Sequence, residues 1–371
     1  MSAVVPLRRA KRGVQRPARL ALLGTGGVGS AFIARYARLA AQGIALPAVS
    51  WICNSRTQIE GGGDLAAALV EARSAAQKRG GFPPWAEGES PRPGDIVVDA
   101  TASETVADWH PEWLSRGIHV VTANKLGTGG ELGRAQAISE AVQAVGARYG
   151  DSATVGAGLP LLRSVRALVE GGDRILSIEG VLSGSLAFLF GGFDGSRPFS
   201  ARVREAAAAG YTEPDPRIDL SGEDVRRKLL ILARAAGFAV PAHEIDVTSL
   251  VPADLAACAS DALDAQWPML DAALASRHAA AAAAGEKLRF VGRFDAHEGG
   301  RVGLRALPAS HPLAAGAGTD NRVAIHSDRY REHPLVIQGP GAGVEVTAAA
   351  LLDDVLAIAA SEAASGRTYA A

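Results

Sequence analysis

One short stretch of the chain gathers charged side chains directly before a strongly apolar helix signal. It reads AGYTEPDPRIDLSGEDVRRKLLILAR and runs from Ala209 to Arg234. Pro214 and Pro216 stiffen the backbone around its carboxylates, and a stiff acidic segment can bind the ammonium group of a substrate. Lys228 follows inside the predicted helix. Its ammonium group, with an ordinary pKa of about 10.4, can donate a proton to a carbonyl oxygen that becomes an alkoxide.

The same residues also have a purely structural interpretation. Ser221 and Asp224 have the S-x-x-D spacing of a capping box before an apolar run. Lys228 lies four residues after Asp224, on the same helix face, where the two would form a weak ion pair. We favour substrate binding, because a solvated acidic loop would not need two prolines, but the residues alone leave both interpretations open.

A second stretch of chemical interest is GTGGVG, which places Gly24, Gly26 and Gly29 in the G-x-G-x-x-G pattern. A bare structural turn could have the same glycines. Here the pattern follows the apolar run Arg19–Leu23 and opens a helix-period stretch, which is the context of a dinucleotide site. Backbone N–H groups at the start of that helix would bind the pyrophosphate. The sequence therefore predicts a bound NAD or NADP.

The end of the second predicted strand bears on the choice of cofactor. NAD-specific sites usually carry an acid there for the ribose 2′-OH, but this strand ends WICNSRT. Asn54 is neutral, and Arg56 could pair with a 2′-phosphate, so NADP is favoured over NAD. Arg56 could equally be a solvated loop residue.

Polar residues also follow the next two predicted strands. Thr101 and Ser103 end the stretch DIVVDATAS, and Lys125 ends GIHVVTANK. In open parallel sheets, ligands bind at the carboxyl ends of the strands. We therefore expect these residues at the cofactor, although Lys125 could be an ordinary surface lysine.

The order of the predicted elements indicates an α/β protein of two domains. Strands and helices alternate over residues 19–150, which predicts a Rossmann-like, doubly wound parallel sheet. Later short, half-alternating runs predict an α+β domain with a mostly antiparallel sheet. We expect a disordered basic tail at 1–18, a dinucleotide-binding domain at 19–150 and 341–371, and a substrate-binding and dimerisation domain at 151–340.

Composition narrows the class of protein. The chain has 371 residues, a formal net charge of −1 and only two cysteines, Cys53 and Cys258. A net charge this close to zero gives no electrostatic potential that would attract nucleic acid or an anionic membrane. No apolar run reaches the ~18 residues of a spanning helix. We expect a cytoplasmic enzyme of small molecules without a transition-metal site.

Several stretches resemble the homoserine dehydrogenases. The acidic stretch GYTEPDPRIDLSGEDVRRK is similar to a signature of that family, and further similar stretches follow its order along the chain: GTGGVGSAF, VTANK, ATVGAGLPLL, EGVLSGSLAFLFG and GAGVEVTAAALLDDV. The residues of these motifs are most similar to the dehydrogenase part of bifunctional aspartokinase–homoserine dehydrogenases. No kinase segment precedes it in this sequence, so we expect a monofunctional enzyme.

The resemblance implies NAD(P)-dependent interconversion of L-homoserine and L-aspartate 4-semialdehyde, in threonine, methionine and isoleucine biosynthesis. It implies catalytic roles for Lys228 and Lys125. The substrate-binding residues would be Glu213, Asp224, Asp219 and Tyr211. The cofactor-binding residues would be Gly24, Gly26, Gly27, Val28, Gly29, Asn54, Arg56, Thr101, Ser103, Lys125, Gly210 and Gly343.

The resemblance further implies a homodimer, formed through the second domain's sheet, and a monovalent cation such as sodium. The cation would bind the carbonyls of Val155, Ala157 and Leu159. The family's side-chain ligand is usually a glutamate, and Ser152 stands in its place, which puts this site in doubt. Two other functions stay open: another two-domain NAD(P)-dependent amino-acid dehydrogenase, and a non-catalytic NADP-binding sensor.

Overall fold

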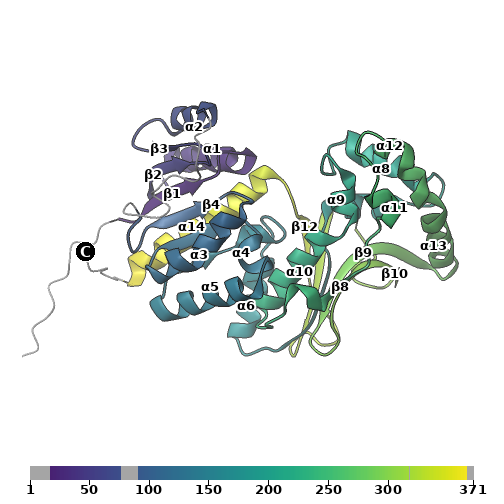
Figure 1. Ribbon diagram of the computed structural model, residues 1–371. Coiled ribbons are helices and arrows are strands. Elements are labelled where there is room, and N and C mark those ends of the chain that lie inside the picture. The colour runs from purple at the N-terminus through teal and green to yellow at the C-terminus, as the bar shows by residue number, and fades with distance from the viewer. Residues whose placement is uncertain (1–16, 77–90, 317, 366–371) are drawn as a thin grey trace, which may run out of the picture.

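Two lobes, each built on one six-stranded sheet, make up the molecule (Figure 1). The computed structural model describes residues 17–76, 91–316 and 318–365. All but the last two residues of the expected basic tail lie outside this range. None of the described helices is long and apolar enough to cross a membrane.

The first sheet has the strand order β3-β2-β1-β4-β5-β6. All neighbouring strands are parallel except β2 and β3, which are antiparallel. The chain reverses its direction of growth at β1, so the carboxyl ends of β1 and β4 lie side by side at the position where such sheets bind ligands. The strands are β1 (Arg19–Leu23), β2 (Ala48–Cys53), β3 (Gln58–Glu60), β4 (Ile96–Asp99), β5 (His119–Thr122) and β6 (Tyr149–Gly150).

Helices cover both faces of this sheet, as predicted for a doubly wound fold. One buried cluster joins Leu20 and Ile52 to Phe32 of α1 and Leu351 of α14. A second cluster, on the other side, contains Trp113 of α3 and residues of α5. The helices of this lobe are α1 (Gly27–Ala41), α2 (Leu65–Ser74), α3 (Glu104–Ser115), α4 (Leu126–Gly129), α5 (Leu132–Val145) and α14 (Val344–Ser365).

The second sheet has the order β12-β11-β7-β9-β10-β8 and is antiparallel except between β10 and β8. The expectation of a parallel and a mostly antiparallel sheet is thus confirmed. The strands are β7 (Ile175–Val181), β8 (Ile245–Val247), β9 (Glu286–Asp295), β10 (Gly299–Pro308), β11 (Asp320–Ser327) and β12 (Leu335–Pro340).

Helices of the second lobe pack against this sheet through one large buried cluster that includes Leu229 of α10, Phe199 of α8 and Phe290 of β9. α10 is the central one of these helices for the site described below. The helices are α6 (Leu161–Glu170), α7 (Gly184–Gly191), α8 (Phe199–Ala208), α9 (Pro216–Leu220), α10 (Glu223–Ala235), α11 (Ala253–Ala256), α12 (Leu263–Gln266) and α13 (Asp271–Ala283).

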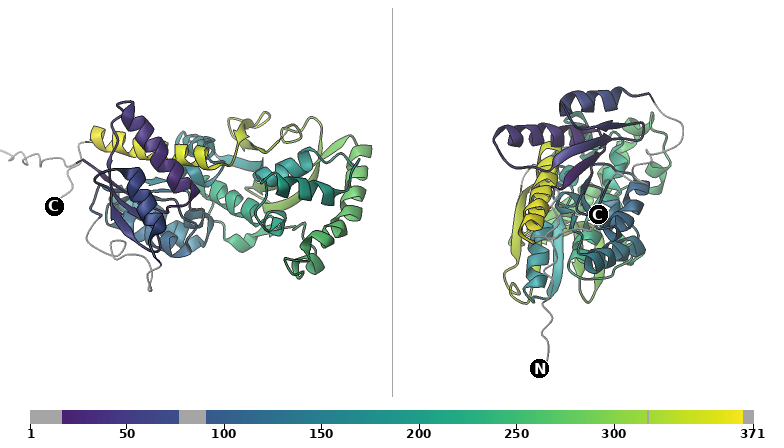
Figure 2. Two further views of the ribbon diagram at one scale, coloured as in Figure 1. Left: turned by 90° about the horizontal axis from the view of Figure 1, so that it is seen from above. Right: turned by 90° about the vertical axis from the view of Figure 1, so that its left-hand side faces the viewer.

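The last helix returns to the first lobe. Figure 2 shows α14, in yellow, alongside α1, in purple. The side chain of Val344, at the start of α14, lies against the start of α1: a Cβ on Gly27 would be 3.1 Å from Cγ1 of Val344. The C-terminal helix therefore brings its own N-terminus to the glycine turn.

The glycine turn itself requires glycine at two positions. Gly24 has φ +98, and a Cβ there would lie 2.7 Å from the carbonyl oxygen of Ala100. A Cβ on Gly29 would overlap the carbonyl oxygen of Gly24. Gly26 is different, because nothing lies within 4 Å of the position of its missing Cβ. The space beside Gly26 is therefore open, whereas Gly24 and Gly29 must be glycine for the turn to fold.

We predict that Gly29→Ala lowers the free energy of unfolding by about 1–3 kcal/mol, because the new methyl group overpacks a rigid backbone contact. The matched control is Gly26→Ser, which adds a side chain in open space at a helix N-cap, where serine is favoured. Urea denaturation without cofactor measures both. Equal midpoints for the two variants would contradict this account of the turn.

Candidate active site

The predicted lysines meet at one carboxylate where α4 and α10 face each other. Lys228 Nζ lies 2.7 Å from Oδ2 of Asp224, and Lys125 Nζ lies 3.4 Å from Oδ1. The two helices approach closely because α4 carries Gly129, whose missing Cβ would lie 2.8 Å from Cγ1 of Ile231. The structure thus brings together three predicted residues from both lobes.

Lys228 is held by two acceptors. Its side chain is 9% exposed, and besides Asp224 it donates to the carbonyl oxygen of Leu182 at 2.8 Å. That carbonyl also accepts a hydrogen bond from Asn321 Nδ2 at 3.3 Å. An ammonium group has three donors, and within the described residues the third has no acceptor. Lys228 is therefore oriented and keeps one N–H for a bound molecule.

Asp224 is the charge partner of both lysines. Burial by the surrounding protein would raise the pKa of Asp224, but the charges of Lys228 and Lys125 outweigh this and hold the pKa well below its ordinary range. The carboxylate therefore stays ionised at neutral pH. Because the folded pKa is depressed, the pairing stabilises the fold above about pH 4 and is lost as the pH falls towards the folded value.

The alternative of a capping box does not hold. Helix α10 begins after Gly222, which has φ 81 and no side chain of its own to cap the helix. Ser221 lies at the end of α9. Its hydroxyl donates to the carbonyl of Ile218 and accepts from the N–H of Glu223 at 3.2 Å, but it makes no hydrogen bond with Asp224. The S-x-x-D spacing does not form a capping box because Gly222, in the left-handed conformation, ends α9 and begins α10 between Ser221 and Asp224. Asp224 is thereby available to the lysines.

The acidic stretch divides into structural and available carboxylates. Asp215 caps α9 and pairs with Arg217 at 2.7 Å, so it is structural. Asp219 accepts from Ser185 Oγ at 2.6 Å and from the backbone N–H of Glu213 at 2.8 Å. Both of its oxygens are thus engaged in holding the loop. Glu213 is exposed, and its carboxylate has no hydrogen bond or ion pair with the described residues.

One short segment connects this loop to Lys228. Leu182 holds the lysine through its carbonyl, and Ser185, three residues later, holds Asp219. The loop that carries Glu213 and the helix that carries Lys228 are therefore fixed to the same turn after β7. Tyr211, also expected here, is 46% exposed and packs its ring 4.8 Å from that of Phe188.

Most of the expected cofactor residues gather at the carboxyl edge of the first sheet. A Cβ on Gly24 would lie 3.2 Å from Cγ2 of Thr101, so the glycine turn and the loop after β4 are adjacent. Ser103 caps α3 by accepting from the N–H of Val106. Gly26, Gly27, Val28 and Gly29 open α1 in the same region, and Gly343 directly precedes α14. Gly210, with φ 71, belongs instead to the second lobe, after α8.

Asn54 and Arg56 have different surroundings. Asn54 is buried, and its amide group is fully used: it donates to Thr25 Oγ1 and the carbonyl of Ala72, and accepts from the N–H groups of Arg56 and Thr57. It therefore shapes the turn. The guanidinium of Arg56 donates to the carbonyl of Arg73 at 2.8 Å, at the end of α2.

Arg73 is a further candidate for binding the cofactor, and the sequence analysis did not identify it. Its Nη1 lies 3.5 Å from Oγ of Ser30, in the first turn of α1. The guanidinium of Arg73 thus borders the start of the helix that follows the glycine turn, and that of Arg56 contacts the backbone of Arg73. No spacing rule pointed to Arg73, because only the folded chain brings the end of α2 to the start of α1.

Two of the four expected cation ligands, Ser152 and Leu159, are engaged in other contacts. Ser152 donates its hydroxyl and its N–H to the carboxylate of Asp354, at 2.8 and 2.9 Å, and Arg163 adds a third hydrogen bond at 2.9 Å. Burial raises the pKa of Asp354, which these hydrogen bonds oppose. The carbonyl of Leu159 accepts from Leu161 N at 2.8 Å. Val155 and Ala157 flank this turn, where Ala157 has φ 49. These contacts do not fit a cation with Ser152 as its ligand.

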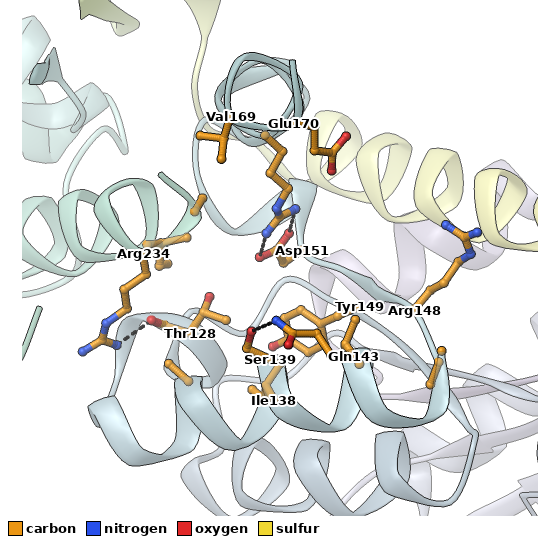
Figure 3. Close-up of a pocket in the computed structure, with 17 residues that line it drawn as sticks. Thr128, Ile138, Ser139, Gln143, Arg148, Tyr149, Asp151, Val169, Glu170 and Arg234 are labelled. Carbon is orange, nitrogen blue, oxygen red and sulfur yellow. Dashed lines mark hydrogen bonds and ion pairs between the residues drawn. The ribbon is translucent and has the colours of Figure 1, made fainter. Parts of the chain in front are cut away.

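A cavity lies elsewhere, between α5, α6 and α10. It has a volume of about 730 Å³ and is lined by Ile138, Tyr149 and Arg234 among others. Figure 3 shows Asp151 paired with a guanidinium above Tyr149. Neither Asp224 nor either of the two lysines lines it, so we place the chemistry at the α4–α10 contact and not in this cavity.

Two family models match this chain. Residues 160–356 match the family model of homoserine dehydrogenase, and residues 24–150 match that of its NAD-binding domain. A Zea mays bifunctional aspartokinase/homoserine dehydrogenase is 46% identical over 72% of this chain, which spans only 29% of that protein. Homoserine dehydrogenase of Emericella nidulans is 38% identical over 92% of this chain and 98% of its own length.

Solved structures have the same fold. A Candida auris protein of unknown function is 34% identical, with a TM-score of 0.82 over 93% of this chain and 99% of that one. A hyperthermophilic archaeal homoserine dehydrogenase solved with NADPH has a TM-score of 0.69 at 22% identity, over 93% and 98% of the two chains. The family models together cover most of the chain, and the fungal relative matches over nearly its whole length; this protein belongs to the homoserine dehydrogenase family.

Proposed function

We propose that the protein interconverts L-homoserine and L-aspartate 4-semialdehyde with a nicotinamide cofactor, as a step of amino-acid biosynthesis in the cytoplasm. The observation that carries this proposal is the carboxylate of Asp224 shared by Lys228 and Lys125 at the junction of the lobes. When bound, the cofactor supplies the hydride chemistry. The first lobe, with α14, would hold the cofactor, and the second lobe would hold the amino acid.

In this proposal Lys228 is the proton donor to the aldehyde oxygen in the reducing direction. Asp224 and the carbonyl of Leu182 use two of its N–H groups, and the third is left for the substrate oxygen. Glu213, which is exposed and held by its backbone, would bind the substrate ammonium, and Asp219 would position Glu213.

We expect Lys228→Gln to lower kcat for homoserine oxidation by about 10²–10⁴-fold, the usual worth of a positioned acid–base group. Its affinity for NADPH, measured by fluorescence titration, is expected to stay close to that of the wild type. Lys287→Gln, at an exposed lysine of β9, is the control. Near-normal turnover of Lys228→Gln would contradict the role of Lys228 as the proton donor.

The same assay separates the alternatives. A wild-type protein that oxidises another amino alcohol faster than homoserine would be a different amino-acid dehydrogenase. One that binds NADPH and turns over neither homoserine nor aspartate semialdehyde would be a sensor.

We further propose that NADP is preferred, with Arg56 and Arg73 binding the 2′-phosphate beside the start of α1. Hydrogen bonds to a charged group contribute about 1.5–3 kcal/mol. Arg56→Gln and Arg73→Gln are therefore each expected to raise KM for NADP by about tenfold or more, with KM for NAD changed less than about twofold. Arg38→Gln, at an exposed residue near the end of α1, serves as the control. Equal changes for both cofactors would argue against this phosphate site.

We also propose a homodimer that forms through the second sheet. β12 is an edge strand of six residues, with Val336 40% exposed, and an open strand edge offers unpaired backbone groups with which another chain can pair. Light scattering is expected to give twice the mass of 38.1 kDa. Val336→Lys, which places a charge on that edge, is expected to shift the protein towards monomer. A monomeric wild type at micromolar concentration would contradict the proposal.

A further inference from the structure

Asp99 is a fully buried carboxylate at the end of β4 whose hydrogen bonds join two strand ends. Its Oδ1 accepts from the backbone N–H of Thr101 at 2.9 Å. Its Oδ2 accepts from Asn124 Nδ2 at 3.0 Å and lies 3.1 Å from Nε2 of His110. The loop after β4 and the loop after β5 are therefore tied to the same group.

Asn124 carries this connection to the catalytic lysine, which is the next residue. Asn124 is 1% exposed, and its side-chain amide donates a second hydrogen bond to the carbonyl of Ser103 at 2.8 Å. Its Oδ1 accepts from the N–H of Leu126 at 3.1 Å. The residues on both sides of Lys125 are thus fixed, and so is the direction in which its side chain leaves the backbone.

His110, which contacts Asp99 through Nε2, also contacts Tyr149: the Tyr149 hydroxyl lies 3.0 Å from Nδ1 of His110. Burial, with the charges of Asp151 and Asp99, raises the pKa of Tyr149 well above its ordinary value. The phenol therefore stays protonated, so it can donate to Nδ1 while Nε2–H donates to Asp99. A Cβ on Gly127 would overlap the Tyr149 hydroxyl, so α4 rests directly on this pair.

Lys125 depends on such support, because its own side chain is weakly held. It is 35% exposed, and its ammonium contacts Asp224 at 3.4 Å, longer than the 2.7 Å contact of Lys228. We propose that Asp99, His110 and Tyr149 form a buried positioning chain that sets, through Asn124, the place of Lys125 opposite Asp224. This inference rests on the role proposed for Lys125 at the active site.

The first test is the accessibility of Lys125, which needs no activity. Wild type, Asp99→Asn and His110→Gln are labelled with an amine-reactive ester, and the rate at each lysine is followed by mass spectrometry. We expect labelling of Lys125 to rise by about threefold or more in both variants, because a misplaced lysine leaves Asp224, while Lys287 is unchanged.

The matched control is His119→Gln. His119 is another fully buried histidine, at the opposite end of β5, where Nδ1 accepts from Arg148 N at 2.9 Å and Nε2 lies 3.7 Å from Glu362. We expect it to affect the melting temperature but not the labelling of Lys125. Tyr149→Phe, which removes one hydroxyl, replaces any variant that does not fold. Equal labelling of Lys125 in wild type and in the folded variants would overturn the proposal.

The second test is a double-mutant cycle on kcat. A misplacement of the kind expected lowers kcat by about tenfold to a hundredfold in Asp99→Asn. If Asp99 acts through Lys125, adding Asp99→Asn to Lys125→Ala costs less than about twofold more. Fully additive losses would show that Asp99 supports only the fold. A wild type that does not oxidise homoserine would count against the proposed function, and the labelling result would still decide the positioning chain.

Discussion

The structure depends on a single carboxylate that is shared by lysines of the two lobes. Asp224 on α10 pairs with Lys228 on the same helix and with Lys125 at the start of α4. A partly buried ammonium group is stable only near a counter-charge, and Lys228 obtains it from a residue one helical turn away. Lys125 comes from the first lobe, so the same charge also makes a contact between the two lobes.

Close packing makes this shared charge possible. Gly129 lets α4 approach Ile231 of α10, and Gly127 lets it approach Tyr149. A side chain at either position would clash with these groups, so α4 could not keep its place beside Asp224. The return of α14 to the first lobe does the same on the cofactor side, where Val344 reaches the glycine turn. In both places small residues set the distance between groups that must cooperate.

Polar side chains that look like ligands in the sequence often turn out to hold the backbone. Asp219 and Asn54 satisfy neighbouring N–H groups with their oxygens, and Ser152 is bound by Asp354 of the last helix. Each is buried or half-buried near the site, where an unsatisfied backbone group is costly. Their role is to position Glu213, the glycine turn and the turn after β6. The residues left for a bound molecule are fewer and more exposed.

The local patterns of the sequence were enough to predict both sheets, the glycine turn and the pairing of Asp224 with Lys228, because strand alternation, turn chemistry and helix spacing act over a few residues. Tertiary structure alone decided which distant residues meet. Lys125 lies 99 positions before Asp224, Arg73 lies 43 after Ser30, and Asp354 lies 202 after Ser152. Such pairs follow from how whole helices pack, and packing depends on the shape of both surfaces together. The left-handed Gly222 likewise ruled out the alternative of a capping box, and Asp224 pairs with the two lysines instead.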